Sequence, residues 1–285
     1  MGPVGVVGAG VMGTGVAQCL AEHGHDVILV DVGEDVLARA RQRIEQDIRM
    51  ARMLRRDLLR DGESIMAAIT CAAELDPLRE ADYVIENITE DWSAKNELYR
   101  RLDEVLAEEC VIAANTSAIP ITRIAGATTR PDRVVGIHFM NPVPMKNTVE
   151  LIAGYHTSAA TVERTEELLS AMGKRAVRVG DSPGFVSNRV LMLTINEAAF
   201  LVHENVADAA AVDEVFVSCF GHPMGPLATA DLIGVDTILR SIEVLHDSFA
   251  DSKYRPCPLL RQMVDAGLHG KKSGQGFFSY GPGAR

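Results

Sequence analysis

Several polar residues along the chain carry side chains that can move a proton or bind an oxygen atom. They are Ser117 in an Asn-Thr-Ser sequence, His138 at the end of an apolar run, Asn141, Glu150 and Asn188. An imidazole takes up a proton near neutral pH, and hydroxyl and amide groups can hydrogen-bond a substrate oxygen. Three of these residues have structural alternatives: His138 can be a purely structural residue, Ser117 can be a turn residue or a helix cap, and Asn188 can cap a helix.

Three glycines near the N-terminus, Gly8, Gly10 and Gly13, follow a short apolar run at residues 4–7. The first allows a sharp turn, the second lets the backbone approach a pyrophosphate, and the third lets a helix pack closely on a strand. A helical pattern, a second apolar run at 27–30 and then Asp31 complete a βαβ unit, so the sequence predicts a dinucleotide site rather than a glycine-rich turn alone. Asp31 can accept from both ribose hydroxyls but repels a 2′-phosphate, which favours NAD over NADP.

Strand and helix patterns then alternate as far as residue 183. Strand-like apolar runs lie at 83–85, 111–114, 133–139 and 176–179, the last as an edge strand, and helical patterns lie at 34–60, 93–106 and 157–172. Further on, the apolar spacing is helical only, at 185–206, 209–219, 228–249 and 257–266. The sequence therefore predicts an α/β fold: a Rossmann-type, doubly wound, mostly parallel sheet at residues 1–183 with a helical arm at about 34–70, then an all-helical domain at 184–285.

The composition is that of a globular protein, with 47% hydrophobic and 24% charged residues among 285. A net charge of −11 argues against nucleic acid and anionic membranes as partners. No apolar run is long enough to span a membrane, and no signal peptide is expected before the first apolar run. Because the five cysteines form no C-x-x-C pair, we expect reduced thiols in a cytoplasmic protein, and no metal site.

The motifs of the chain resemble those of the short-form L-3-hydroxyacyl-CoA dehydrogenases, which include the 3-hydroxybutyryl-CoA dehydrogenases. The resemblance covers nearly the whole chain. It depends on Gly-Ala-Gly-x-Met-Gly at 8–13, Asn-Thr-Ser at 115–117, His-Phe-x-Asn-Pro-Val-Pro at 138–144, Ser-Pro-Gly-Phe-x-x-Asn-Arg at 182–189, and glycine-containing motifs at 221–226 and 270–277. It implies NAD-dependent oxidation of the 3-hydroxyl of a 3-hydroxyacyl thioester such as 3-hydroxybutyryl-CoA, or the reverse reduction of the 3-oxo form.

The resemblance implies a catalytic dyad of His138 and Glu150, with Ser117 and Asn188 holding the substrate. The chemistry of these residue types agrees. Oxidation of an alcohol needs a base for the hydroxyl proton, and a carboxylate on the second ring nitrogen fixes the tautomer and stabilises the imidazolium. Hydrogen bonds from Ser117 and Asn188 would bind the developing alkoxide in the reverse reduction.

By the same resemblance, contacts to NAD are expected from the glycine loop and from residues further along the chain. The loop contributes Gly8, Gly10, Val11, Met12 and Gly13, followed by Asp31. The more distant residues are Glu90, Lys95, Asn115, Asn141 and Lys272. A solvated surface position is the alternative for four of these residues: Glu90, Lys95, Asn141 and Lys272.

Eight arginines lie between residues 39 and 60 and are opposed by three acids. The segment is either a solvated helix face with i,i+4 ion pairs or an arm that docks the phosphates of coenzyme A or an acidic acyl-carrier protein. The expected anion ligands are Arg52, Arg55 and Arg56. The family commonly places a serine and a lysine where this chain has Asp47 and Leu54, so coenzyme A and a carrier protein both stay open as carriers.

Other functions also stay open from the sequence. The same chemistry can serve a carrier-bound hydroxyacyl group in polyketide extender-unit biosynthesis, or a free hydroxy acid or sugar acid. The chain can also be an NAD-binding protein without activity, although the joint presence of the four candidate catalytic residues argues against that. The many apolar residues of the helical domain predict a homodimer, which the resemblance also implies.

Overall fold

The first part of the chain forms one eight-stranded sheet. The computed structural model describes residues 2–53 and 59–281, and the chain divides into two units, Met1–Ser182 and Pro183–Arg285. The strands are β1 (Val4–Val7), β2 (Val27–Val30), β3 (Ile69–Ala72), β4 (Tyr83–Glu86), β5 (Val111–Asn115), β6 (Val134–His138), β7 (Thr148–Ala153) and β8 (Arg175–Gly180). Their order is β3-β2-β1-β4-β5-β6-β7-β8. All pairings are parallel except β6 with β7, which confirms the predicted Rossmann-type, mostly parallel sheet.

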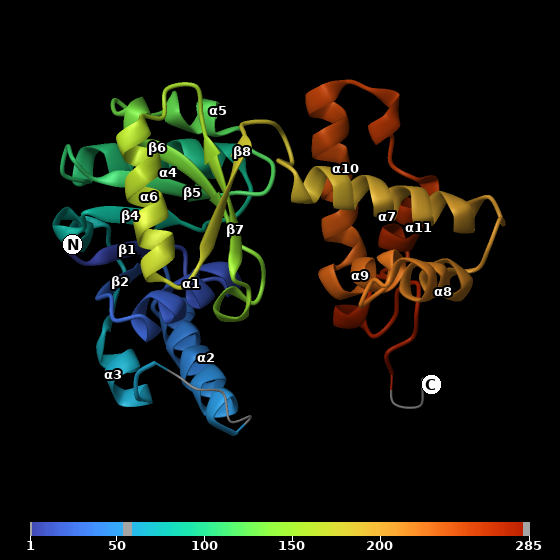
Figure 1. The fold of residues 1–285 in the computed structure, drawn as a ribbon, viewed down its shortest axis with the longest axis horizontal. Helices are drawn as coiled ribbons and strands as arrows, with labels where there is room; N and C mark the ends of the chain where they lie inside the picture. The colour runs from blue at the N-terminus through green and yellow to red at the C-terminus, as the bar shows by residue number, and fades with distance from the viewer. Residues whose placement is uncertain (1, 54–58, 282–285) are drawn as a thin grey trace. The chain divides into compact units, whose positions relative to one another are not determined.

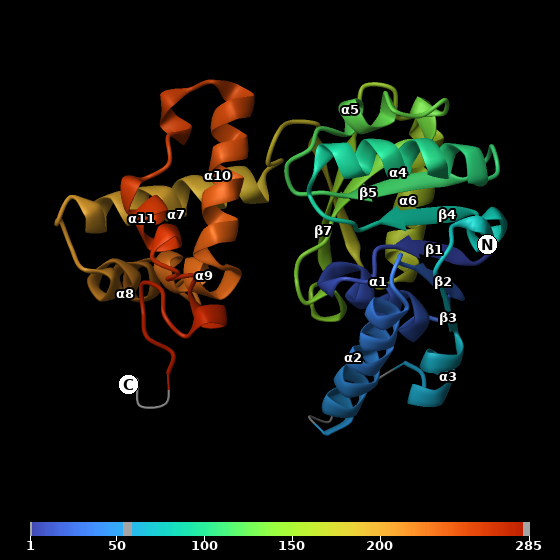
Figure 2. The ribbon, with the colours of Figure 1, turned by 180° about the vertical axis from the view of Figure 1, so that it is seen from behind.

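Helices cover both faces of this sheet. Helices α1 (Val11–Glu22) and α6 (Ala159–Ala171) pack on one face (Figure 1), and α4 (Trp92–Val105) and α5 (Ile121–Ala125) lie on the other (Figure 2). Because both faces are covered, every residue of β1, β2 and β4 is buried, and these strands are apolar throughout except for Glu86 at the end of β4. Short 3₁₀ turns complete the unit: η1 (Asp76–Glu80), η2 (Pro131–Arg133) and η3 (Val143–Met145).

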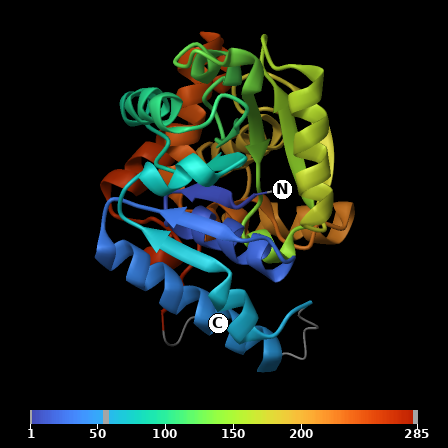
Figure 3. The same cartoon turned by 90° about the vertical axis from the view of Figure 1, so that its left-hand side faces the viewer.

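The predicted arm is a pair of helices, α2 (Glu34–Met53) and α3 (Gly62–Ala67), that lie side by side at the end of the sheet near β2 and β3 (Figures 1 and 3). Helix α2 buries a stripe of apolar residues at helical spacing: Leu37, Ala40, Ile44, Ile48 and Ala51. On its outer side, i,i+4 ion pairs join Arg39 to Asp35, Arg43 to Asp47 and Arg49 to Glu45. These three arginines therefore match the solvated-face alternative. Arg55, Arg56 and Leu54 lie outside the described residues.

The second unit is helical in its described part, as predicted. It consists of α7 (Ser187–His203), α8 (Ala209–Phe220), α9 (Pro226–Ile233), α10 (Val235–Phe249) and α11 (Pro258–Asp265), with turns η4 (Ser252–Tyr254) and η5 (Lys271–Ser273). Its own core includes Ile195, Leu227, Ile238 and Ile242. The helix predicted over 228–249 is two helices, because Gly234 between α9 and α10 has a φ of +111° that other residues rarely adopt. Within residues 2–53 and 59–281, no helix is long and apolar enough to cross a membrane.

Two strands of the sheet were not predicted from the sequence. Strand β3 is short and only its first residue, Ile69, is buried. Strand β7 follows two polar residues, 146 and 147, begins with a third, Thr148, and its apolar run is interrupted by Glu150. Since β7 carries one of the candidate catalytic residues, its antiparallel pairing with β6 is decisive for the site.

Candidate active site

The glycine loop between β1 and α1 has the close packing expected of a dinucleotide site. Gly8 has a φ of +93°, and a Cβ atom on Gly13 would lie 1.7 Å from the carbonyl oxygen of Gly8. A Cβ on Gly10, in contrast, would meet no atom within 4 Å, so the backbone there faces open space. No side chain of the described residues caps α1 at Gly10. The first turn of this helix therefore presents its N–H groups and partial positive charge to a ligand.

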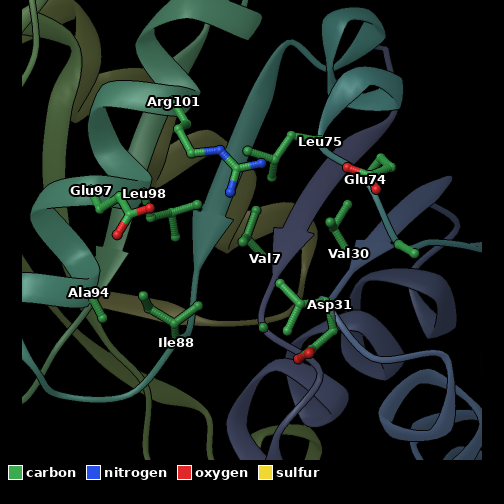
Figure 4. A pocket seen from close by; sticks show the side chains of 13 residues that line it. Val7, Val30, Asp31, Glu74, Leu75, Ile88, Ala94, Glu97, Leu98 and Arg101 are labelled. Carbon is green, nitrogen blue, oxygen red and sulfur yellow. The ribbon is translucent and has the colours of Figure 1, made fainter.

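Asp31 lies directly after β2, beside the glycine loop. Its Oδ2 accepts a hydrogen bond from the Ala9 N–H at 2.7 Å. A cavity of about 460 Å³ opens between the strand ends, which contribute Val7, Val30 and Asp31, and helix α4, which contributes Ala94, Leu98 and Arg101 (Figure 4). The open space above Gly10 and this cavity beside Asp31 fit a dinucleotide with its phosphates on the loop and its ribose at the carboxylate.

His138 and Glu150 face each other across neighbouring strands. The antiparallel register places His138, the last residue of β6, directly opposite Glu150 of β7, so both side chains project from the same face. His138 Nδ1 lies 2.8 Å from Glu150 Oε2, and the side chains are only 8% and 9% exposed. On the other side of the ring, His138 Nε2 lies 3.1 Å from Ser117 Oγ. The structure thus brings three predicted residues into a hydroxyl–imidazole–carboxylate chain.

Two asparagines join the glycine loop to this chain of residues. The N–H of Asn87 donates to the carbonyl of Val7 at 2.7 Å, and its side-chain oxygen accepts from Asn115 Nδ2 at 2.7 Å. Asn115 Oδ1 in turn accepts from the N–H of Phe139, the residue after His138, at 3.3 Å. Side chains therefore tie together the ends of β4, β5 and β6, and a backbone hydrogen bond adds the end of β1. Asn115 was predicted as a cofactor ligand, whereas Asn87 was missed, because nothing in its sequence context distinguishes it from a loop asparagine.

Glu90 lies in the loop between β4 and α4, with one carboxylate oxygen against the loop that carries Ser117. Its Oε1 accepts from the N–H groups of Ser117, Ala118 and Ile119 at 3.0, 2.9 and 3.3 Å, and from Thr116 Oγ1 at 2.5 Å. The side chain is otherwise exposed. The predicted contact of Glu90 with NAD stays a prediction, and the structure adds a second set of partners.

Lys95 is enclosed in the protein rather than exposed beside the cofactor cavity. Its Nζ lies 2.6 and 2.7 Å from the two oxygens of Glu86, and both side chains are 0% exposed. Tyr99 donates a further hydrogen bond to Glu86 at 2.9 Å. Burial raises the pKa of Glu86, and the charge of Lys95 opposes that rise. The expected contact of Lys95 with NAD stays a prediction, while its ion pair gives it a structural role in α4.

Asn141 lines a second cavity of about 460 Å³, on the other side of the glycine loop. The same cavity is lined by Gly10 and Val11 of the loop, and by Arg39, Arg43 and Asp47 of the arm. Arg43 Nε lies 3.1 and 3.0 Å from the two carboxylate oxygens of Asp47. The arm residues beside the glycine loop are therefore Arg39 and Arg43 rather than the predicted Arg52, which is not among the residues that line this cavity.

Asn188 and Lys272 belong to the second unit. Asn188 is the second residue of α7 and is half-buried. Lys272 Nζ forms an ion pair with Asp236 at 2.6 Å. Although partial burial opposes ionisation of Asp236, the hydrogen bond from Lys272 lowers the pKa of this carboxyl. The contacts predicted for Asn188 with substrate and for Lys272 with NAD stay predictions.

A Rossmann-type sheet with a glycine-rich loop, and an imidazole–carboxylate pair at the same edge, define the class as nicotinamide-dependent dehydrogenases. Residues 3–182 match the NAD binding domain of 3-hydroxyacyl-CoA dehydrogenase, and residues 184–280 match the C-terminal domain of 3-hydroxyacyl-CoA dehydrogenase. The chain belongs to the 3-hydroxyacyl-CoA dehydrogenase family. The predictions of the family, of an oxidoreductase acting on CH–OH groups and of NAD as the cofactor are confirmed.

Individual relatives resemble the chain over almost its full length. A probable 3-hydroxybutyryl-CoA dehydrogenase of Bacillus subtilis is 46% identical over 275 residues, which cover 96% of this chain and 96% of the relative. The human mitochondrial hydroxyacyl-coenzyme A dehydrogenase is 39% identical over 286 residues, which cover 97% of this chain and 90% of the human protein. The crystal structure of (S)-3-hydroxybutyryl-CoA dehydrogenase from Ralstonia eutropha has a TM-score of 0.94 at 41% identity, over 98% of this chain and 99% of the other.

Proposed function

We propose that this dehydrogenase interconverts 3-hydroxybutyryl-CoA, or a closely similar short 3-hydroxyacyl-CoA, with its 3-oxo form, and that His138 moves the proton. The observation that carries the proposal is the chain of hydrogen-bonding atoms from Ser117 Oγ through both ring nitrogens of His138 to Glu150 Oε2. It lies at the edge of the sheet where the glycine loop also lies.

In oxidation, His138 Nε2 takes the proton of the substrate 3-hydroxyl. Glu150 holds the Nδ1 proton, so the neutral ring presents Nε2 as an acceptor, and its charge stabilises the imidazolium once the proton has moved. Ser117 binds the substrate oxygen beside Nε2 and thereby positions it for the transfer. NAD, when bound, supplies the acceptor for the hydride that leaves C3. In reduction, the imidazolium returns the proton and Ser117 stabilises the alkoxide.

The residues proposed to hold NAD surround the glycine loop. Gly8, Gly10 and Gly13 shape the backbone, and the first turn of α1, with Val11 and Met12, offers N–H groups to the pyrophosphate. Asp31 would bind the ribose hydroxyls, and Asn115 and Asn141 would complete the contacts along the sheet edge. Lys272 from the second unit, like Asn188 for the substrate, belongs to the proposal on the strength of the family resemblance.

The proposed activity is tested by following NADH oxidation with acetoacetyl-CoA and with free acetoacetate. We expect turnover of the thioester and loss of turnover with the free acid, because the carrier supplies binding energy that the reacting group lacks. Equal turnover of both would favour a free hydroxy-acid dehydrogenase. Binding of NADH without turnover of either would favour a protein that binds the cofactor only.

The carrier of the acyl group is proposed to be coenzyme A, with an acyl-carrier protein as the second candidate. Arg39 and Arg43 of α2 line the second cavity and offer positive charge to the phosphates of such a carrier. This chain has an acid, Asp47, at a position where a hydroxyl residue is common in the family. This difference keeps the carrier protein as a candidate. Comparing 3-hydroxybutyryl-CoA with the same acyl group on a carrier protein decides between them. A larger kcat/KM for the carrier-protein substrate would place the enzyme in a carrier-dependent pathway such as the synthesis of polyketide extender units.

We also propose that the enzyme is a cytoplasmic homodimer that pairs through its helical unit. Helices α8 and α9 expose apolar side chains, with Val215 48%, Phe220 65% and Leu232 54% exposed. Isolated exposed apolar residues are ordinary, but several on neighbouring helices are typical of an interface. Light scattering at micromolar concentration should give the dimer mass for the wild type and the monomer mass for Phe220→Asp. Cell fractionation tests the location.

A further inference from the structure

Ser117 is held by a loop whose backbone N–H groups converge on one atom. The segment 116–119, between β5 and α5, directs the N–H groups of Ser117, Ala118 and Ile119 and the hydroxyl of Thr116 at Oε1 of Glu90. Successive N–H groups arranged in this way form an anion-binding concavity known as a nest. Here the anion comes from the chain itself, from a different loop 26 residues earlier.

The 116–119 segment is also held in place by burial and by contacts at the start of α5. Thr116, Ala118 and Ile119 are buried, at 2%, 6% and 9% exposed. At the start of α5, the carboxylate of Asp181 accepts from the N–H groups of Ile121 and Thr122, both at 2.8 Å. Ser117 is the partly exposed residue between these anchored positions, and its Oγ lies 3.1 Å from His138 Nε2.

The loop that carries Glu90 is itself attached to both neighbouring elements. One residue further on, Asp91 caps α4 by accepting from the Ala94 N–H at 2.9 Å. The guanidinium of Arg123 on α5 stacks over the ring of Trp92, the first residue of α4, at 4.1 Å. Glu90 therefore reaches the nest from a loop that is anchored to α4 and α5.

We infer that Glu90 is a positioning residue for Ser117: by occupying the nest it sets the place of the Ser117 hydroxyl beside His138. Without the carboxylate, three convergent N–H dipoles would repel one another and the segment would relax. A displacement of about 1 Å in a reacting group can cost about 10²-fold in rate. This inference depends on the proposed function, since it concerns the step that Ser117 and His138 perform.

The test combines turnover with amide hydrogen exchange in Glu90→Ala, with Glu90→Gln as the conservative variant and Glu104→Gln, an exposed residue of α4, as the matched control. At saturating NADH and acetoacetyl-CoA, we expect kcat to fall about 10²-fold in Glu90→Ala. Glu90→Gln, which keeps an acceptor oxygen, should recover most of that loss, and Glu104→Gln should match the wild type. Amide exchange across 116–119 should accelerate in Glu90→Ala only.

The double variant of Glu90 and Ser117 tests more sharply whether Glu90 acts through Ser117. If Glu90 acts through Ser117, then adding Glu90→Ala to Ser117→Ala should change kcat no more than about two-fold, the scatter of independent sites. Multiplication of the two single losses, or unchanged exchange at 116–119 in Glu90→Ala, would overturn the inference. Should Glu90→Ala fail to fold by circular dichroism, Glu90→Ser, whose side chain is too short to reach the nest, with and without Ser117→Ala decides in its place by the same criterion. A wild type without turnover contradicts the proposed function instead, and the exchange measurement then decides whether Glu90 holds the loop.

Discussion

Two pairs of a carboxylate and a base are buried in the first unit, each with at least one member on the sheet, and their surroundings differ. In the first, Glu86 and Lys95 are 0% exposed, and Glu86 also accepts from Tyr99 and from the N–H of Ile88. In the second, Glu150 holds one nitrogen of His138 while the other nitrogen meets a partly exposed serine hydroxyl. The described residues shield both side chains of the first pair from solvent. The second pair, in contrast, is a hydrogen-bonding partner of the Ser117 hydroxyl, which solvent and ligands can reach.

The difference shows why only one of these pairs suits catalysis. An enclosed ammonium–carboxylate pair gains its stability from fixed partners and has nothing to exchange a proton with. An imidazole that a carboxylate orients from one side can accept and return a proton on the other. Burial and an acidic partner, which both pairs share, therefore do not identify an active site by themselves.

The largest expected effect concerns the orienting carboxylate of the second pair. Glu150→Gln keeps the size of the side chain but lets an amide face His138 Nδ1, which no longer selects the neutral tautomer with Nε2 as acceptor. We expect kcat to fall by about 10⁴-fold, because loss of the orienting carboxylate in a comparable histidine-based site has that size. Steady-state kinetics with NADH and acetoacetyl-CoA measure it. A kcat within a factor of a few of the wild type would remove Glu150 from the proposed mechanism.

The enclosed pair should respond in stability rather than in chemistry. Lys95→Met leaves the Glu86 carboxylate buried without its partner, which costs about 3–5 kcal/mol of unfolding free energy. Denaturant unfolding at pH 7 measures the loss. The kcat of the folded fraction should fall far less than in Glu150→Gln. An unchanged unfolding free energy would show that the pair does not stabilise the fold.

A pH series sharpens the same comparison. Burial already raises the pKa of Glu86, and removal of Lys95 raises it further, above the unfolded value of about 4.3. A carboxyl whose folded pKa is raised contributes stability below the unfolded pKa and loses it as pH rises through the folded pKa. Lys95→Met should therefore lose stability, relative to the wild type, between about pH 5 and pH 8. The double variant Glu86→Gln/Lys95→Met should not show that relative loss, and an equal loss in it would contradict the account.

The smallest effect is expected at Asp31, outside both pairs. Asp31→Asn keeps an acceptor for the Ala9 N–H but removes the charge that repels a 2′-phosphate. The preference for NADH over NADPH, measured as the ratio of kcat/KM values, should fall about 10-fold, since hydrogen bonds to a charged group contribute about 1.5–3 kcal/mol. A wild type that prefers NADPH would refute the assignment directly.

The parts of the site that depend on local sequence were predictable, and those that depend on tertiary pairing were not. Strand β1, the glycine loop, α1 and Asp31 follow one another within 31 residues, so spacing alone defines them. The contact of His138 with Glu150 needs the antiparallel β7, whose polar residues obscure the strand pattern. The burial of Lys95 and the reach of Glu90 into the 116–119 loop come from packing between elements far apart in sequence, which no periodicity encodes.

The most direct test of the central claim is the activity and cofactor affinity of His138→Gln. The account predicts a kcat lower by about 10²–10⁴-fold, the usual contribution of a positioned acid–base group, together with a Kd for NADH, measured by fluorescence titration, equal to that of the wild type. A His138→Gln enzyme that turns over acetoacetyl-CoA at the wild-type rate would contradict it.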